Sequence, residues 1–210
     1  IDVTSTLNEK HRAALGLDTS PYVEGKTTIV AAFVGSGGKI QKAKVSANLT
    51  AARLSAPELN WAKPEDANAT LKADIVFKPN KTFEIANIDA VGQGMKAEGR
   101  LLIADGNIRE ADFKRLLLGE RNDFALSYRK AADGSMSIDA KGKVVDAGGL
   151  LESDDDDDNP EPPSKKAKRP FTLKAAFDLA YLQGDVWFTG VKFNYATDGQ
   201  HLTAFKVDAS

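Results

Sequence analysis

Apolar and polar residues alternate with a period of two along most of this chain, from about residue 25 onward. In 69–77, Ile75 and Phe77 fall on one side of the alternation, and Lys72 and Asp74 fall on the other. Successive side chains of a β-strand point to opposite faces, so this period is typical of strands with one buried and one wet face. Antiparallel sheets have such strands. The clearest runs are 69–77, 95–103, 124–129, 136–144, 171–182, 187–195 and 201–209.

Turn signals separate these runs. The pairs Asp105-Gly106, Asp133-Gly134 and Asp198-Gly199 suit type I′ turns, because Asp and Gly both accept a positive φ. The glycines of 35–38 indicate another chain reversal. The sequence therefore predicts a series of β-hairpins.

Two segments depart from the alternation. Residues 4–15 are predicted to form a short helix, with Thr6 and Glu9 as a capping box and Gly16 as the stop. Residues 55–68 contain two prolines and are predicted to be a loop or crossover. We expect Trp61 in this segment to be a buried anchor.

The stretch 153–169 also interrupts the strand series, which resumes directly after it. It reads SDDDDDNPEPPSKKAKR. Calcium loops space their ligands at alternate positions and include a glycine, so five adjacent aspartates do not suit a metal site. The basic part resembles a nuclear import signal by composition, which is a weak motif. We predict an inserted, exposed and mobile connection between strands.

Composition narrows the classes of function. The chain has 210 residues, a net charge of −2, no cysteine and two histidines, His11 and His201. Disulfides and cysteine chemistry are excluded, and a nucleic-acid partner is disfavoured because such proteins are usually basic. We find no catalytic motif, cofactor motif or metal-ligand pattern, and we expect no enzyme activity.

No apolar run is long enough to span a bilayer. The chain begins with Ile1, and we interpret it as a piece of a longer protein.

Three stretches resemble one protein family. Residues 45–71 carry an L-x-x-A-x-L-x-x-P-x-L-x-W-x-K-P phrase, which is similar to a segment of AsmA-like bacterial envelope proteins of the DUF3971 (YhdP-type) group. The matching residues are Leu49, Ala52, Leu54, Pro57, Leu59, Trp61, Lys63 and Pro64. The stretches 85–103 and 171–209 are similar to later repeats of the same group.

This resemblance implies the fold and a function. It implies one β-rich unit over 1–210, with a long twisted antiparallel sheet curled into a groove or half-barrel and a short N-terminal helix. It also implies a periplasmic protein, anchored to the inner membrane by a segment outside this sequence, which carries phospholipid for outer-membrane biogenesis. Its partners would be phospholipid or another acyl-chain ligand and neighbouring segments of the same chain. A homo-oligomer through sheet edges is a further expectation.

Shared parity within the strands predicts which residues line the groove. The candidates are Leu71, Ile75, Phe77, Leu101, Ile103, Phe124, Leu126, Ile138, Phe171, Phe177, Trp187 and Phe193. The same face could instead be filled by side chains as a self-packed sandwich core. A further alternative is a scaffold of the same fold that contacts proteins through its sheet edges and carries no lipid.

Overall fold

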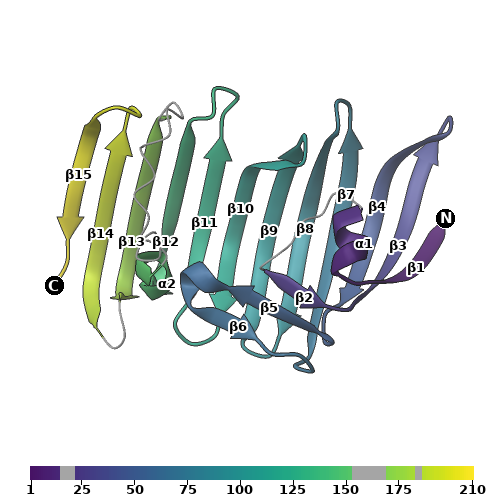
Figure 1. The fold of residues 1–210 in the computed structure, drawn as a ribbon, viewed down its shortest axis with the longest axis horizontal. Coiled ribbons are helices and arrows are strands. Elements are labelled where there is room, and N and C mark those ends of the chain that lie inside the picture. Colours follow the sequence, from purple (N-terminus) through teal and green to yellow (C-terminus); the bar gives the residue numbers. More distant parts are fainter. Residues whose placement is uncertain (15–21, 153–168, 183–185) are drawn as a thin grey trace.

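The computed structural model describes residues 1–14, 22–152, 169–182 and 186–210. Within these residues, twelve strands form one large sheet and three short strands form a small one (Figure 1). The large sheet has the order β1-β3-β4-β7-β8-β9-β10-β11-β12-β13-β14-β15. Its strands are β1 (Asp2–Leu7), β3 (Thr27–Ser36), β4 (Lys39–Asn48), β7 (Ala69–Lys78), β8 (Thr82–Gly92), β9 (Met95–Ala104), β10 (Asn107–Leu118), β11 (Asp123–Lys130), β12 (Met136–Asp146), β13 (Phe171–Tyr181), β14 (Trp187–Thr197) and β15 (Leu202–Asp208). The mostly-β prediction is confirmed.

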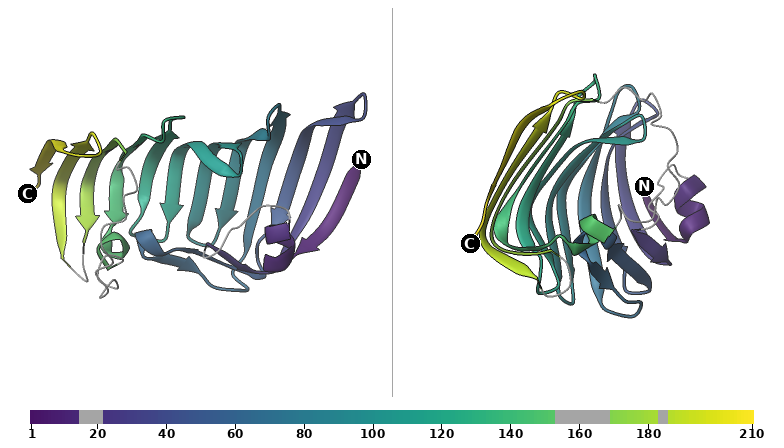
Figure 2. Two further views of the ribbon diagram at one scale, coloured as in Figure 1. Left: turned by 45° about the horizontal axis from the view of Figure 1, so that its top comes forward. Right: turned by 60° about the vertical axis from the view of Figure 1, so that its left-hand side comes forward.

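The small sheet crosses the lower part of one face of the large sheet (Figures 1 and 2). It contains β2 (Val23–Gly25), β5 (Ala52–Ala56) and β6 (Trp61–Lys63), in the order β2-β5-β6. The described helices are α1 (Glu9–Ala14), α2 (Gly148–Glu152) and the 3₁₀ helix η1 (Pro57–Leu59). We call the face that carries the small sheet the inner face and the opposite one the outer face.

The sheet is antiparallel at every described junction except one. β12 and β13 are parallel neighbours, with Met136 opposite Phe171 and Asp146 opposite Tyr181. Parallel strands need a long crossover connection, and α2 and residues 153–168 lie between these two strands in the sequence. The stretch predicted as an insert therefore connects the parallel pair. Apart from Arg169, it lies outside the described residues.

The large sheet is curled, and its two edges, β1 and β15, stay apart (Figure 2). Its ladders contain several register shifts, for example between Lys72 and Asp74 and between Phe113 and Arg115. Such bulges bend the strand that carries them. Gly99 lies at a close approach of β9 and β10, because a Cβ there would clash with the Asp112 carbonyl oxygen and lie 2.7 Å from a ring carbon of Phe113. Bulges and this glycine account for a curved sheet.

The predicted helix over 4–15 is wrong at its start. Residues 2–7 form strand β1, which pairs with β3, and the helix begins only at Glu9. Val3, Thr4 and Thr6 favour a strand because they are β-branched. The side chain of Asn8, rather than Thr6, accepts a hydrogen bond from the His11 backbone at 3.0 Å. The predicted stop at Gly16 lies outside the described residues.

The segment 55–68 is not simply a loop. It contributes the end of β5, the helix η1 and strand β6, and β5 and β6 pair antiparallel with Ala56 opposite Trp61. The prolines do not break this pairing, since Pro57 begins the 3₁₀ helix and Pro64 follows β6. Trp61 packs partly buried against a hydrophobic cluster.

The predicted turns are present between the expected strands. Asp105 and Gly106 have φ values of 51° and 73°, as a type I′ turn requires. Gly134 and Gly199 have positive φ in the β11–β12 and β14–β15 connections, but Asp133 and Asp198 do not, so the type I′ prediction is wrong for these two turns. The glycines at 37 and 38 reverse the chain between β3 and β4.

Candidate functional site

The inner face is built from rows of residues that lie opposite one another on successive strands. Residues in register on neighbouring strands point to the same face, so the pairing defines each row directly. A middle row runs from β3 to β15 and contains only apolar or tyrosine side chains. Its members are Phe33, Ala43, Ile75, Ile85, Leu101, Ala111, Tyr128, Ile138, Leu173, Tyr195 and Phe205.

A lower row runs parallel to it, on the side where the small sheet lies. Its members are Ile29, Ala47, Leu71, Ala90, Ala97, Leu116, Phe124, Gly142, Phe177 and Val191. Most of this row is part of the core. Leu71 and Ala97 pack against a cluster that includes Ala52 and Leu54 of the small sheet. Phe124 and Phe177 form a second cluster, with ring centroids 5.7 Å apart and an edge-to-face geometry.

Buried polar groups fix the cover over the lower row. The Asn122 side chain is 1% exposed, and its amide donates to the Leu59 carbonyl of η1 at 3.0 Å. Its carbonyl oxygen accepts from the Asp146 backbone at 3.0 Å. Lys63, at the end of β6, is 2% exposed and donates to the carbonyls of Thr50, Pro64 and Ala67. Burial lowers the pKa of Lys63.

The middle row has no such cover among the described residues. None of its members belongs to either core cluster, although Ala43 and Ala111 are buried, at 1% and 7% exposed. Phe205, at its end on β15, is 62% exposed. The small sheet and α2 lie over the lower ends of the strands, while the upper part of the inner face carries no described element (Figures 1 and 2).

An upper row continues the apolar surface toward the strand ends. On β7 to β10 it consists of Phe77, Phe83, Ile103 and Ile108. On β11 to β15 it consists of Lys130, Met136, Phe171, Thr197 and Leu202. Lys130 is the one charged residue in the three rows, counted over the strands that the structure describes. Its neighbour Tyr128 donates its hydroxyl toward the Met136 sulfur at 3.8 Å.

The structure distributes the twelve groove candidates over these rows. Leu71, Phe124 and Phe177 are in the covered lower row, and Leu126 packs against the second core cluster. The middle row contains Ile75, Leu101 and Ile138, and the upper row contains Phe77, Ile103 and Phe171. Phe193 lies between the lower and middle rows, opposite Ala175 and Val207.

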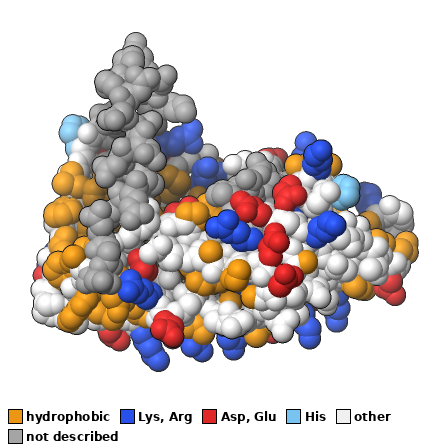
Figure 3. Space-filling view, turned by 60° about the horizontal axis from the view of Figure 1, so that its bottom comes forward, with side chains coloured by type: hydrophobic (Ala, Val, Ile, Leu, Met, Phe, Trp, Pro, Cys, Tyr) orange, Lys and Arg blue, Asp and Glu red, His pale blue; other side chains and the backbone are white. Residues whose placement is uncertain are grey.

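Trp187 does not join the rows. Trp187 begins β14 opposite Tyr181, beyond Val191, which is the last member of the lower row. Between them, Gly190 has a φ of 59°. Trp187 is 56% exposed. Hydrophobic side chains gather on the surface at this end of the molecule (Figure 3).

The outer face behind the middle row carries an ion-pair network. Arg100 contacts Glu110 at 3.0 Å and Asp112 at 2.7 Å. Arg129 contacts the same Asp112 at 2.9 Å, and the Ser127 hydroxyl donates to it at 2.9 Å. Partial burial alone would raise the pKa of Asp112, but these hydrogen bonds and the two guanidinium charges lower it. The network therefore links β9, β10 and β11 on the side opposite the open rows.

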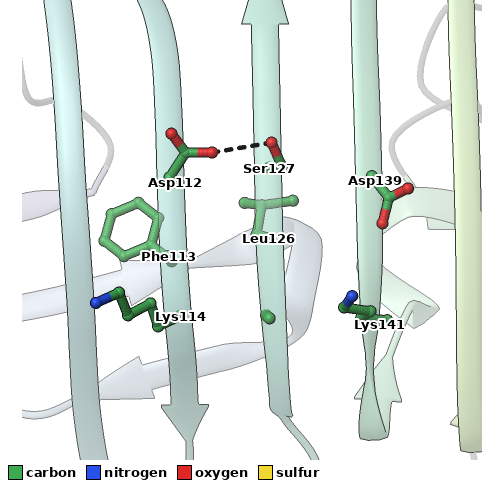
Figure 4. Close-up of a pocket in the computed structure, with 8 residues that line it drawn as sticks. Asp112, Phe113, Lys114, Leu126, Ser127, Asp139 and Lys141 are labelled. Atoms are coloured by element: carbon green, nitrogen blue, oxygen red, sulfur yellow. Dashed lines mark hydrogen bonds between the residues drawn. The ribbon is translucent and has the colours of Figure 1, made fainter.

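An open depression of about 240 Å³ lies beside this network, across β10, β11 and β12 (Figure 4). Its polar lining includes Lys114, Lys141, Asp112 and Asp139, so the two signs of charge balance. The Ser127 hydroxyl is bonded to Asp112 and has no histidine beside it in the lining. This arrangement offers neither an activated nucleophile nor a site selective for one charge.

In the described part of the chain, no group of three or more His, Asp or Glu side chains is placed to hold a metal ion, and the helices there are short. No helix of this part is long and apolar enough to cross a membrane. His11 lies on α1, and His201 forms a contact of 3.4 Å with Asp198 in the β14–β15 turn.

Sequence reasoning overlooked Lys130 and the covering role of the small sheet. Lys130 shares the parity of Phe124, Leu126 and Tyr128, so the alternation itself contains the signal. The run predicted as a strand, 124–129, ends one residue before it. The small sheet has strands of three to five residues, which are too short to show a clear period.

Comparison with known proteins adds no relative. No family model, no curated protein and no solved structure matches this chain.

Proposed function

We propose that this chain is a non-enzymatic segment of a periplasmic, inner-membrane-anchored AsmA-like protein that carries phospholipid in outer-membrane biogenesis. The observation that supports this proposal is the uncovered middle row, which is apolar from β3 to β15. A monomeric soluble protein rarely exposes a large contiguous apolar surface unless it binds something. Acyl chains lying along the middle and upper rows would remove this surface from water.

The dimensions and energies are suitable for acyl chains. Neighbouring strands are ~4.8 Å apart, so a row over eleven strands is roughly 50 Å long. The hydrocarbon core of a bilayer, two chains deep, is only ~30 Å thick. Each buried methylene contributes about 0.8 kcal/mol, so two acyl chains would gain enough to leave water.

A pair of adjacent substitutions tests this proposal. Ile75 lies in the middle row, whereas Val76 lies opposite Lys42 and Glu84 on the outer face. We expect Ile75→Asp to stay folded and to lose the lipid that the parent protein captures from phospholipid vesicles. Val76→Asp should stay folded and retain it. Captured lipid is measured by mass spectrometry after gel filtration, and folding by circular dichroism.

The result separates a groove from a core. If Ile75→Asp unfolds, the middle row is a packed core and the proposal fails. It also fails if the parent captures no lipid or if Ile75→Asp captures as much as the parent.

The edge strand β15 favours a second candidate function, a protein-binding scaffold without lipid. Leu202, Phe205 and Val207 are 58%, 62% and 51% exposed, and β15 contains no proline. An uncovered, apolar edge strand is a template for pairing with another strand. In this case Val207→Lys should abolish association, measured by sedimentation, while the parent captures no lipid from vesicles.

A further inference from the structure

Lys130 is an unusual charge on the inner face. It continues the inward parity of β11 and lies opposite Met136 in the upper row. It is half-buried, and no carboxylate of the described residues forms an ion pair with it. The adjacent Arg129, on the outer face, contacts both Glu110 and Asp112. Among the described residues, the charge of Arg129 is therefore matched by carboxylates and that of Lys130 is not.

A second cation lies at the same corner of the sheet. The Met136 backbone donates to the Pro170 carbonyl at 3.0 Å, which places Arg169 beside the β11–β12 turn. The Arg169 guanidinium donates to the Asp133 carbonyl at 3.3 Å. Arg169 also lines an open depression of about 400 Å³ together with Tyr195, Thr197 and His201. This depression lies at the upper end of the rows on β14 and β15.

The nearby carboxylates are already engaged in turns. Asp133 accepts from the Ser135 backbone at 2.8 Å and from its hydroxyl at 2.7 Å. Asp198 accepts from the backbones of Gln200 and His201, each at 2.7 Å. These hydrogen bonds lower the pKa of both carboxyl groups. These two acids thus cap their own turns, and among the described residues neither forms an ion pair with Lys130.

We infer that this corner binds the anionic headgroup of a lipid whose acyl chains lie along the middle and upper rows. The inference rests on the proposed function and specifies its ligand class. An amphiphile with a negative head suits a surface that is apolar along the rows and cationic at their upper end. Ammonium and guanidinium groups both form charge-assisted hydrogen bonds to phosphate oxygens.

The test compares two lipids with the same acyl chains. Vesicles contain either dioleoylphosphatidylglycerol, which is anionic, or dioleoylphosphatidylcholine, which has no net charge, and captured lipid is quantified after gel filtration. We expect the parent protein to capture more of the anionic lipid. Lys130→Met should reduce this preference by about fivefold, as expected for the loss of one partly exposed ion pair. Lys130→Arg should retain it.

A matched control removes a lysine from the outer face. Lys141 lies on the neighbouring strand β12 and is exposed there, so Lys141→Met should leave the preference unchanged. Glycerol phosphate, which has the head but no chains, should not compete at millimolar concentration. Effective competition would indicate a site for free phosphate esters and would overturn the inference.

The remaining outcomes separate the two proposals. If the parent captures no lipid at all, the proposed function fails and the headgroup site fails with it. If the parent captures both lipids equally, or if Lys130→Met keeps the parent's preference, only the headgroup site is overturned.

Discussion

The lower and upper halves of the inner face have the same hydrophobic pattern but different neighbours. In the lower half, the small sheet and η1 pack on the strands, and Phe124 and Phe177 are almost fully buried. In the upper half, Ile75, Leu101 and Ile138 are half-buried, and no described element packs on them. Parity fixes which face a side chain occupies, whereas the covering elements decide whether that face is a core.

This difference bears on the choice between a groove and a self-packed core. The pattern alone left both open for the whole face. The structure divides the face, since the core clusters lie below and the uncovered rows lie above. A stability measurement should therefore respond to the lower half, and a lipid-capture measurement should respond to the upper half.

The largest expected effect comes from breaking the lower half. Phe124→Ala should reduce the free energy of unfolding by about 3–5 kcal/mol, because the ring is buried against Phe177 and would leave a cavity. Phe171→Ala in the upper row should cost about 1 kcal/mol or less, since its ring is only partly buried near Tyr195. Denaturant unfolding measures both variants. Equal losses would contradict the division of the face.

A smaller effect is expected from Asn122, whose buried side chain links η1 to the large sheet. Asn122→Ala removes the hydrogen bonds to the Leu59 carbonyl and from the Asp146 backbone, and it leaves both groups buried without this partner. We expect a loss of about 2–3 kcal/mol in the free energy of unfolding. Asn107→Ala, at the exposed start of β10, is the matched control and should stay within about 0.5 kcal/mol. A loss no larger than that of this control would show that the Asn122 hydrogen bonds do not hold η1 against the large sheet.

Much of the fold could be predicted because its signals are local. The period of two in 69–77 or 171–182 and the Asp-Gly pairs identify strands and turns without any distant contact. The helix start failed because the β-branched residues of 2–7 pair with β3, a contact some twenty residues away in sequence. The parallel junction between β12 and β13 was also missed, since parity does not say which way the next strand runs.

The candidate site was predictable in composition but not in accessibility. Eleven of the twelve candidates lie on the rows of the inner face or between them, as their parity requires, and Trp187 lies beyond the end of the lower row. The strands β2, β5 and β6 decide which candidates are covered. They are too short to show a clear hydrophobic period in the sequence. The same parity also predicts that Lys130 faces inward, since it lies two residues beyond Tyr128.

The smallest expected effect concerns the outer-face network behind the open rows. Arg100, Asp112 and Arg129 link β9, β10 and β11 where the inner side has no described cover. The pKa of Asp112 is lowered in the folded state from an ordinary value of 3.8. Its ion pairs therefore stabilise the fold fully above about pH 3.8 and lose this contribution as the pH falls further, through the folded-state pKa.

Acidification should then loosen the upper half before the lower half. The protection factors of amides around Leu101 and Tyr128, which correct for the slow intrinsic exchange at low pH, should fall between pH 7 and pH 3 more than those around Phe124 in the covered cluster. Asp112→Asn should show lower protection factors at these positions already at pH 7, and a smaller drop between pH 7 and pH 3 than the parent. Ser127→Ala, which removes one hydrogen bond from the carboxylate, should fall between the two. If the exchange of Asp112→Asn matches the parent at both pH values, the network does not support the open rows. Interactions that stabilise the upper half would then have to be sought on the inner face, and a bound acyl chain would be the first of these to test.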